Sequence, residues 1–149
     1  MTRFAHSALA ALISLTPLAT SLGFSQAAHA ADLSVYSGDD GSVCGENWVL
    51  SKITDRFSYQ VHHVPHLPVV AITDFRNIRQ HRYEPASDEW PIGRHYCRAT
   101  VNLSDGRDRS IFYLIEEGQG FASIGDNVEF CVSGFDRWLV YNGRCRVLR

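Results

Sequence analysis

The sequence contains almost no lysine and, after residue 30, no long apolar run. Lys52 is the only lysine, against thirteen arginines and sixteen acidic residues. A chain with this weakly acidic balance lacks the basic surface by which proteins bind nucleic acid. A helix that spans a membrane needs about 20 consecutive apolar residues, and no such run follows residue 30. We therefore expect no nucleic-acid partner, and no membrane span once the N-terminal segment is removed.

The motifs of several common enzyme classes are also missing. Ser133 is not part of a Gly-x-Ser-x-Gly nucleophile elbow. The glycine-rich stretch 118–125 has neither the dinucleotide-binding spacing nor that of a phosphate loop. Neighbouring carboxylates such as Asp88 and Glu89 are more typical of a solvated surface than of an acid–base pair. The sequence names no catalytic residue and no cofactor, which favours a protein without enzymatic activity.

Residues 1–30 have the layout of a secretory signal peptide. Arg3 provides the positive start, an apolar run covers 8–24, and Ala28 and Ala30 are the small residues of a cleavage site. Threonine, serine and proline interrupt the apolar run, which argues against a membrane anchor. Cleavage would leave thirteen cations and sixteen acids, a formal charge of −3.

We expect the chain that remains after cleavage to form one domain. Residues 31–43 are small and polar, and we interpret them as a flexible N-terminal arm. Residues 44–149 contain no internal repeat and no linker, and their number fits a single domain.

The four cysteines are predicted to form two disulfides. An exported chain with an even number of cysteines oxidises them, whereas the spacing here lacks the Cys-x-x-Cys pairs of a zinc site. We expect Cys131 to pair with Cys145, because a hairpin would bring their strands together. Cys44 would then pair with Cys97 and fasten the start of a helix to the sheet.

One segment has a clear helical pattern, and we expect a helix over 46–58. Val49, Ile53 and Phe57 recur every four residues and form an apolar stripe. Trp48 lies beside this stripe, which favours a place in the core over a role as a ligand platform. We expect the stripe to pack on a sheet face that includes Val101, Ile111 or Tyr113.

Beyond residue 60 the apolar pattern changes to a period of two. The expected strands are 69–85, 95–103, 109–117, 127–132, 137–141 and 144–148. An Asp-Gly turn at 105–106 and an Asn-Gly turn at 142–143 predict hairpins, the second of which would place Val140 opposite Cys145. The sequence therefore predicts an α+β fold in which one N-terminal helix packs on a curved antiparallel sheet of about five strands. A cystatin-like roll would satisfy this order of elements.

The stretch between helix and sheet is rich in histidine. His62, His63 and His66 lie close together, and clustered imidazoles are typical ligands of zinc and copper. Two prolines favour an extended backbone, in which His62 and His63 would point in opposite directions. A third ligand such as His81 or His95 would then be needed. The three histidines are weak metal candidates, and we expect a connector without a metal.

A cationic and aromatic stretch near the predicted edge of the sheet is the candidate binding surface. Arginine and aromatic residues are enriched in recognition surfaces and bind anionic groups. The alternative is an edge strand that charge keeps soluble. The candidate residues are Arg76, Arg79, His81, Arg82, Tyr83 and Trp90.

Residues 92–149 contain a series of short motifs. They are a Tyr-Cys on a strand, an Asp-Gly hairpin, a Val-Glu-x-Cys-Val segment, a Gly-x-Asp-Arg segment and a closing Cys-Arg, formed by Tyr96, Cys97, Asp105, Gly106, Val128, Glu129, Cys131, Val132, Gly134, Asp136, Arg137, Cys145 and Arg146. This pattern resembles a group of small exported alphaproteobacterial proteins of unknown function. The resemblance implies the periplasm as the location and assigns no catalytic residue.

Two functions follow as hypotheses. The first is an exported, disulfide-stabilised periplasmic protein that binds an envelope protein or a cell-wall glycan and has no catalytic activity. The second is a small periplasmic hydrolase or metal-dependent enzyme that uses the region of His62, His63 and His66. A recess lined by these histidines would favour the second hypothesis.

Overall fold

A computed structural model describes residues 42–149. The expected signal peptide lies outside these residues, as does the expected arm except for its last two residues. The elements that follow are η1 (Val43–Gly45), α1 (Asn47–His63), β1 (Ile72–Glu84), β2 (Arg94–Leu103), β3 (Asp108–Glu116), η2 (Phe121–Ser123), β4 (Asn127–Val132) and η3 (Arg146–Leu148).

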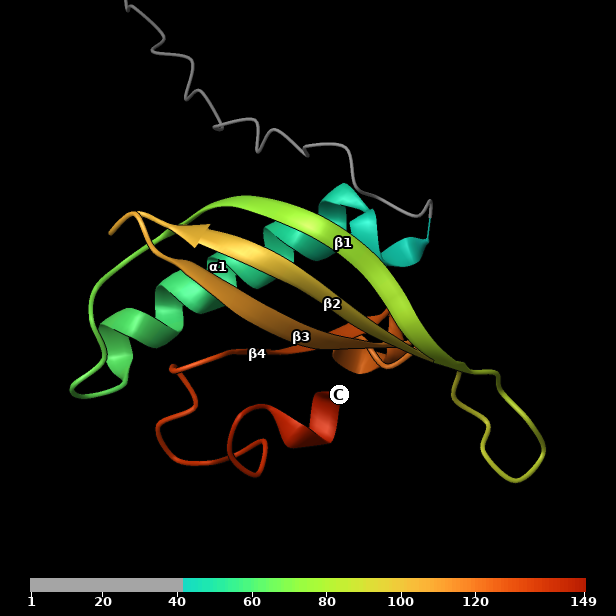
Figure 1. The fold of residues 1–149 in the computed structure, drawn as a ribbon. Coiled ribbons are helices and arrows are strands. Elements are labelled where there is room, and N and C mark those ends of the chain that lie inside the picture. The colour runs from blue at the N-terminus through green and yellow to red at the C-terminus, as the bar shows by residue number, and fades with distance from the viewer. Residues whose placement is uncertain (1–41) are drawn as a thin grey trace, which may run out of the picture. The chain divides into compact units, whose positions relative to one another are not determined.

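The four strands form one antiparallel sheet in the order β1-β2-β3-β4, with α1 lying across one of its faces (Figure 1). The α+β class and the packing of the helix on the sheet are confirmed. The expectation of about five strands is wrong, because the described residues form four. We call the face that α1 covers the inner face and the opposite one the outer face.

Helix α1 is longer than the predicted 46–58. Val61 continues the apolar stripe by another four residues and is buried, so the helix gains enough contact with the core to continue. It ends at His63, and the following Val64 has an extended backbone before Pro65. His62 and His63 therefore lie on the last turn of the helix, and the expected extended connector at this point is wrong.

The core lies between α1 and the inner face. Val49, Ile53 and Phe57 are buried in one cluster with Val101, Ile111 and Tyr113, as expected from the alternating pattern. Trp48 is 40% exposed, so its expected place in the core is wrong. Phe57 also packs edge to face on the ring of Phe135, with ring centroids 5.0 Å apart.

The two predicted disulfides are confirmed. Cys44–Cys97 joins the turn before α1 to β2, and Cys131–Cys145 joins β4 to the C-terminal segment, residues 133–149. The predicted hairpin between β2 and β3 is also present, and Gly106 turns the chain with a positive φ of 77°.

The C-terminal segment is not the predicted pair of strands at 137–141 and 144–148. The carboxylate of Asp136 accepts hydrogen bonds from the backbone N–H groups of Val140 and Tyr141, which curls the chain locally. Leu139, Asn142, Arg144 and Cys145 have positive φ, so the segment winds through turns. The predicted Asn-Gly hairpin, with Val140 opposite Cys145, therefore does not form. Instead, Cys145 and Leu148 pack on the outer face beside Leu114.

Phe57 provides a direct test of the core. We expect Phe57→Ala to lower the free energy of unfolding by about 3–5 kcal/mol, because the side chain is fully buried and its removal leaves a cavity. Urea unfolding followed by circular dichroism measures the change. Ser51→Ala, at an exposed position of the same helix, is the matched control and is expected to unfold like the parent. A Phe57→Ala variant as stable as the control would contradict this packing.

Candidate arginine recess on the outer face

Side chains on the outer face form rows that cross β1, β2 and β3. The strand register places Glu84 opposite Arg94 and Arg94 opposite Glu116, and each following row lies two residues further along β2. The five rows, from one end to the other, are Glu84–Arg94–Glu116, Arg82–Tyr96–Leu114, Arg79–Arg98–Phe112, Arg76–Thr100–Ser110 and Asp74–Asn102–Asp108.

At one end of the outer face the arginines have acidic or aromatic partners. Arg94 forms an ion pair with Glu116 at 3.1 Å. Arg82 forms an ion pair with Glu84 at 3.3 Å, and its guanidinium lies 3.5 Å from the ring centroid of Tyr96. Such cation–π contacts favour a fixed position for the side chain.

At the other end of the outer face, the fourth row also contains a paired arginine. Arg76 forms an ion pair with Asp108 across the sheet and donates a hydrogen bond of 2.9 Å to the side chain of Asn102. At both ends of the outer face, each arginine therefore has an acidic partner.

The middle row is different, because it places two arginines opposite each other. Neither the Arg79 nor the Arg98 side chain forms an ion pair or a side-chain hydrogen bond with any residue in the described range 42–149. Like charges directly opposite on neighbouring strands are destabilising. The pair therefore leaves two guanidinium groups, each with several N–H donors, available to an anion.

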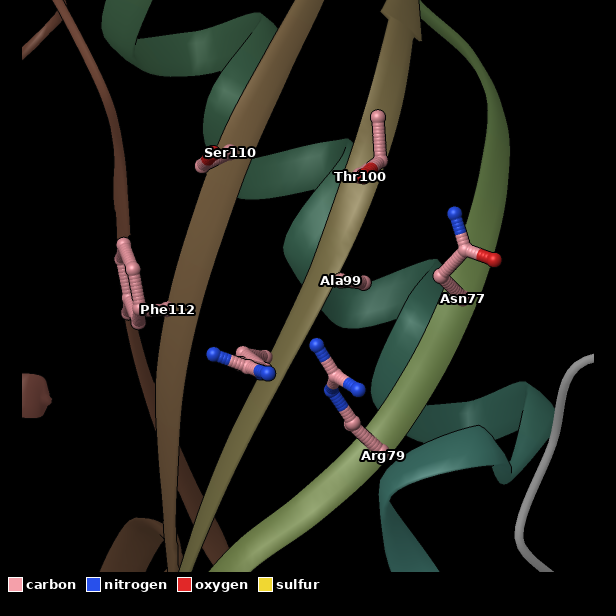
Figure 2. Close-up of a pocket in the computed structure, with 7 residues that line it drawn as sticks. Asn77, Arg79, Ala99, Thr100, Ser110 and Phe112 are labelled. Atoms are coloured by element: carbon pink, nitrogen blue, oxygen red, sulfur yellow. The ribbon is translucent and has the colours of Figure 1, made fainter.

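A recess of about 350 Å³ lies over this pair. Figure 2 shows Arg79 reaching from β1 toward β2, with Thr100 and Ser110 further along the neighbouring strands. We call this feature the arginine recess, and its lining residues are Asn77, Arg79, Arg98, Ala99, Thr100, Ser110 and Phe112. The lining combines two cations, two hydroxyl groups, an amide and one aromatic ring.

His81 lies on β1, two residues after Arg79 of the recess. Partial burial lowers the pKa of His81, and the charges of Arg82 and Arg79 lower this pKa further. Its ring faces that of Tyr96, with centroids 6.3 Å apart. The imidazole is therefore neutral at neutral pH, and an anion bound near Arg79 would favour its protonation.

The structure divides the predicted binding surface into two parts. Arg76, Arg79 and Arg82 share the outer face, as described above. Tyr83 has the opposite orientation, and its ring stacks on His95 with centroids 4.4 Å apart. Trp90 is 62% exposed and lines another recess with Tyr83, in the connection between β1 and β2.

Arg98 is the residue that sequence reasoning missed. It lies on β2, far along the chain from the arginine-rich stretch of β1, and only the register brings it opposite Arg79. The alternation of β2 gives a usable signal, because Arg98 falls on the polar side of a strand whose other side is apolar.

The three candidate metal ligands are not gathered into a site. The Nδ1 atoms of His62 and His63 contact the backbone carbonyls of Ser58 and Tyr59, at 2.6 and 2.7 Å. Across residues 42–149, no three histidine, cysteine or acidic side chains gather closely enough to hold a metal ion. The reason given from sequence, an extended backbone, is wrong, while the expectation that no metal binds stays a prediction.

Comparisons with known proteins assign the chain to no family. No family model, no curated protein and no solved structure matches the chain. The resemblance to exported alphaproteobacterial proteins and the analogy with a cystatin-like roll therefore stay predictions. Within the part of the chain that the structure describes, no helix has the length and apolar character needed to cross a membrane.

The repulsion between Arg79 and Arg98 leads to a prediction about stability. We expect Arg98→Gln to raise the urea midpoint of unfolding slightly at low salt, because it removes repulsion from Arg79. The gain is expected to disappear at about 1 M salt, where charges are screened within about 3 Å. Arg76→Gln, which breaks the ion pair with Asp108, is the matched control and is expected to give no gain. An Arg98→Gln variant less stable than the parent at low salt would contradict the repulsion.

Proposed function

We propose that this protein is an exported periplasmic binding protein without catalytic activity, which holds a carboxylate-bearing cell-wall glycan in the arginine recess. One observation carries the proposal: Arg79 and Arg98 lie directly opposite each other and neither has an acidic partner among residues 42–149. A bound carboxylate would turn this repulsion into two charge-assisted interactions.

The covalent structure supports export. All four cysteines are paired in two disulfides. Disulfides persist in oxidising compartments such as the bacterial periplasm and are rare in the cytosol. The signal-peptide pattern of residues 1–30 agrees with this location.

The chemistry of the recess favours a carboxylate on a sugar. Guanidinium groups bind carboxylates through two parallel hydrogen bonds. The hydroxyls of Thr100 and Ser110 and the amide of Asn77 can exchange hydrogen bonds with sugar hydroxyls, and the ring of Phe112 offers an apolar contact. A recess of about 350 Å³ lies at the lower end of the usual range for small-ligand sites, which favours a short glycan over a protein surface.

Binding can be tested with soluble disaccharide–peptide fragments of peptidoglycan. We expect the parent to bind these fragments and the double variant Arg79→Gln/Arg98→Gln to bind at least about tenfold more weakly. Hydrogen bonds to charged groups contribute about 1.5–3 kcal/mol, and about 1.4 kcal/mol corresponds to tenfold in affinity. Isothermal titration calorimetry measures both dissociation constants.

Two controls make this test specific. Arg76→Gln removes a guanidinium of the same face that already has a partner, and is expected to change the affinity much less. Fragments whose carboxylates are converted to amides are expected to bind weakly to the parent. Equal affinity of the double variant and the parent would contradict the proposed site. Tight binding of an acidic protein by the parent, with no glycan binding, would contradict the ligand class.

His81 predicts how the affinity depends on pH. Its pKa is lowered in the free protein by burial and by Arg82 and Arg79, and a bound carboxylate opposes the effect of the two arginines. Binding is then accompanied by proton uptake, so the affinity is expected to rise as the pH falls below about 6.5, the ordinary value for histidine. If ligand binding raises the pKa of His81 by one unit, the affinity rises by up to about tenfold. Titrations between about pH 7 and about pH 5 measure it, and the same pH dependence in His81→Gln would contradict this role.

The alternative function is a small hydrolase or metal-dependent enzyme that uses His62, His63 and His66. The four recesses described for residues 42–149 are not lined by any histidine, which disfavours this alternative. Release of products from peptidoglycan by the purified protein, abolished by His63→Ala, would replace the binding proposal with this one.

A further inference from the structure

A loop in the C-terminal segment presents three consecutive large apolar side chains to solvent. Trp138, Leu139 and Val140 are 65%, 64% and 67% exposed, and Val147 nearby in sequence is 56% exposed. Exposed apolar patches of this kind mark sites of interaction with proteins or membranes. We call residues 138–140 the apolar loop.

The apolar loop is held in place by its surroundings. Both carboxylate oxygens of Asp136 accept backbone hydrogen bonds, from Val140 at 2.8 Å and from Tyr141 at 3.1 Å. The disulfide at Cys145 and the buried Leu148 anchor the chain that follows. A fixed loop loses little conformational entropy when it binds.

Leu139 has a backbone conformation that large side chains rarely adopt. Its φ of 56° lies in the left-handed region, which costs a leucine free energy. Strained residues of this kind cluster at functional sites, where the surrounding structure maintains them. The exposed position of Leu139 is therefore maintained against a local cost.

Beyond Asp136, the charged side chains of the C-terminal segment have one sign. Residues 137–149 contain four arginines and no aspartate or glutamate. All four arginines are exposed, and none forms an ion pair with any residue in the range 42–149. They are Arg137, Arg144, Arg146 and Arg149.

From these features we propose that the C-terminal segment binds the surface of a bilayer leaflet that contains anionic lipid. The apolar loop enters the interfacial layer, where tryptophan is favoured, and Arg137, Arg144 and Arg146 contact lipid phosphates. The protein lies on the leaflet and does not span it. This inference is independent of the arginine recess and goes beyond the proposed glycan binding.

A second exposed apolar region differs from the apolar loop in the sign of the charges around it. Phe121 and Ile124 are 95% and 80% exposed in the connection between β3 and β4. Acidic residues, Glu116, Glu117 and Asp126, surround them in sequence. An anionic leaflet would repel this region, whereas it attracts residues 137–149. The two regions are therefore a matched pair for an experiment.

Tryptophan fluorescence tests the proposal on the purified protein. Replacing Trp48 and Trp90 by phenylalanine leaves Trp138 as the single tryptophan. With vesicles of phosphatidylglycerol and phosphatidylcholine in equal parts, we expect a blue shift and quenching by brominated lipid tails. With pure phosphatidylcholine we expect neither. Each arginine near an anionic surface contributes about 1 kcal/mol, so Arg144→Gln/Arg146→Gln is expected to weaken binding roughly 25-fold.

Vesicle sedimentation of further variants completes the test. Leu139→Ser/Val140→Ser is expected to lose binding, and Phe121→Ser/Ile124→Ser is expected to bind like the parent. The variant Arg79→Gln/Arg98→Gln is also expected to bind vesicles normally, so failure of the glycan site and failure of the lipid surface are distinguishable. Unchanged binding after loss of the apolar loop residues would overturn the proposal. Self-association through the loop, with no vesicle binding, would overturn it in favour of protein docking.

Discussion

One disulfide on each face of the sheet ties that face to a segment outside the sheet. The position of the charged side chains depends on this separation of the two faces. Cys97 points to the inner face and binds Cys44 beside α1, whereas Cys131 on the outer face binds Cys145. The alternation of side chains along an antiparallel strand makes the two faces independent. The helix covers the inner face, so the rows of charged side chains are accessible only where the C-terminal segment leaves the outer face open.

The C-terminal segment covers only part of the outer face. Cys145, Leu148 and Tyr141 pack near Leu114 and Phe112 of β3, and the guanidinium of Arg149 lies 4.9 Å from the ring centroid of Phe112. Phe112 therefore separates a covered half of the outer face from an open half. The arginine recess occupies the open half, beside the cover that presents the apolar loop.

Local patterns in the sequence predicted much of the fold, because period-two alternation and the helical stripe are set by neighbouring residues. Two of the features that the sequence did not predict have clear physical reasons. The Asn-Gly turn at 142–143 is a strong hairpin signal, but backbone capping by Asp136 and the tether at Cys145 override it. The pairing of Arg79 with Arg98 depends on an irregularity in β1 between Arg76 and Arg79, which shifts the register. No pattern in the sequence marks that shift.

The remaining alternative for the cationic face is protection of an exposed sheet edge, and the position of Arg98 argues against it. β1 is an edge strand, and charged side chains on edges prevent pairing with other chains. Arg76 and Arg82 fit this role while keeping acidic partners. Arg98, however, lies on β2, whose two edges are already paired with β1 and β3. Edge protection accounts for charge on β1 but not for an unpaired charge on the interior strand β2, whereas the anion site proposed above accounts for both Arg79 and Arg98.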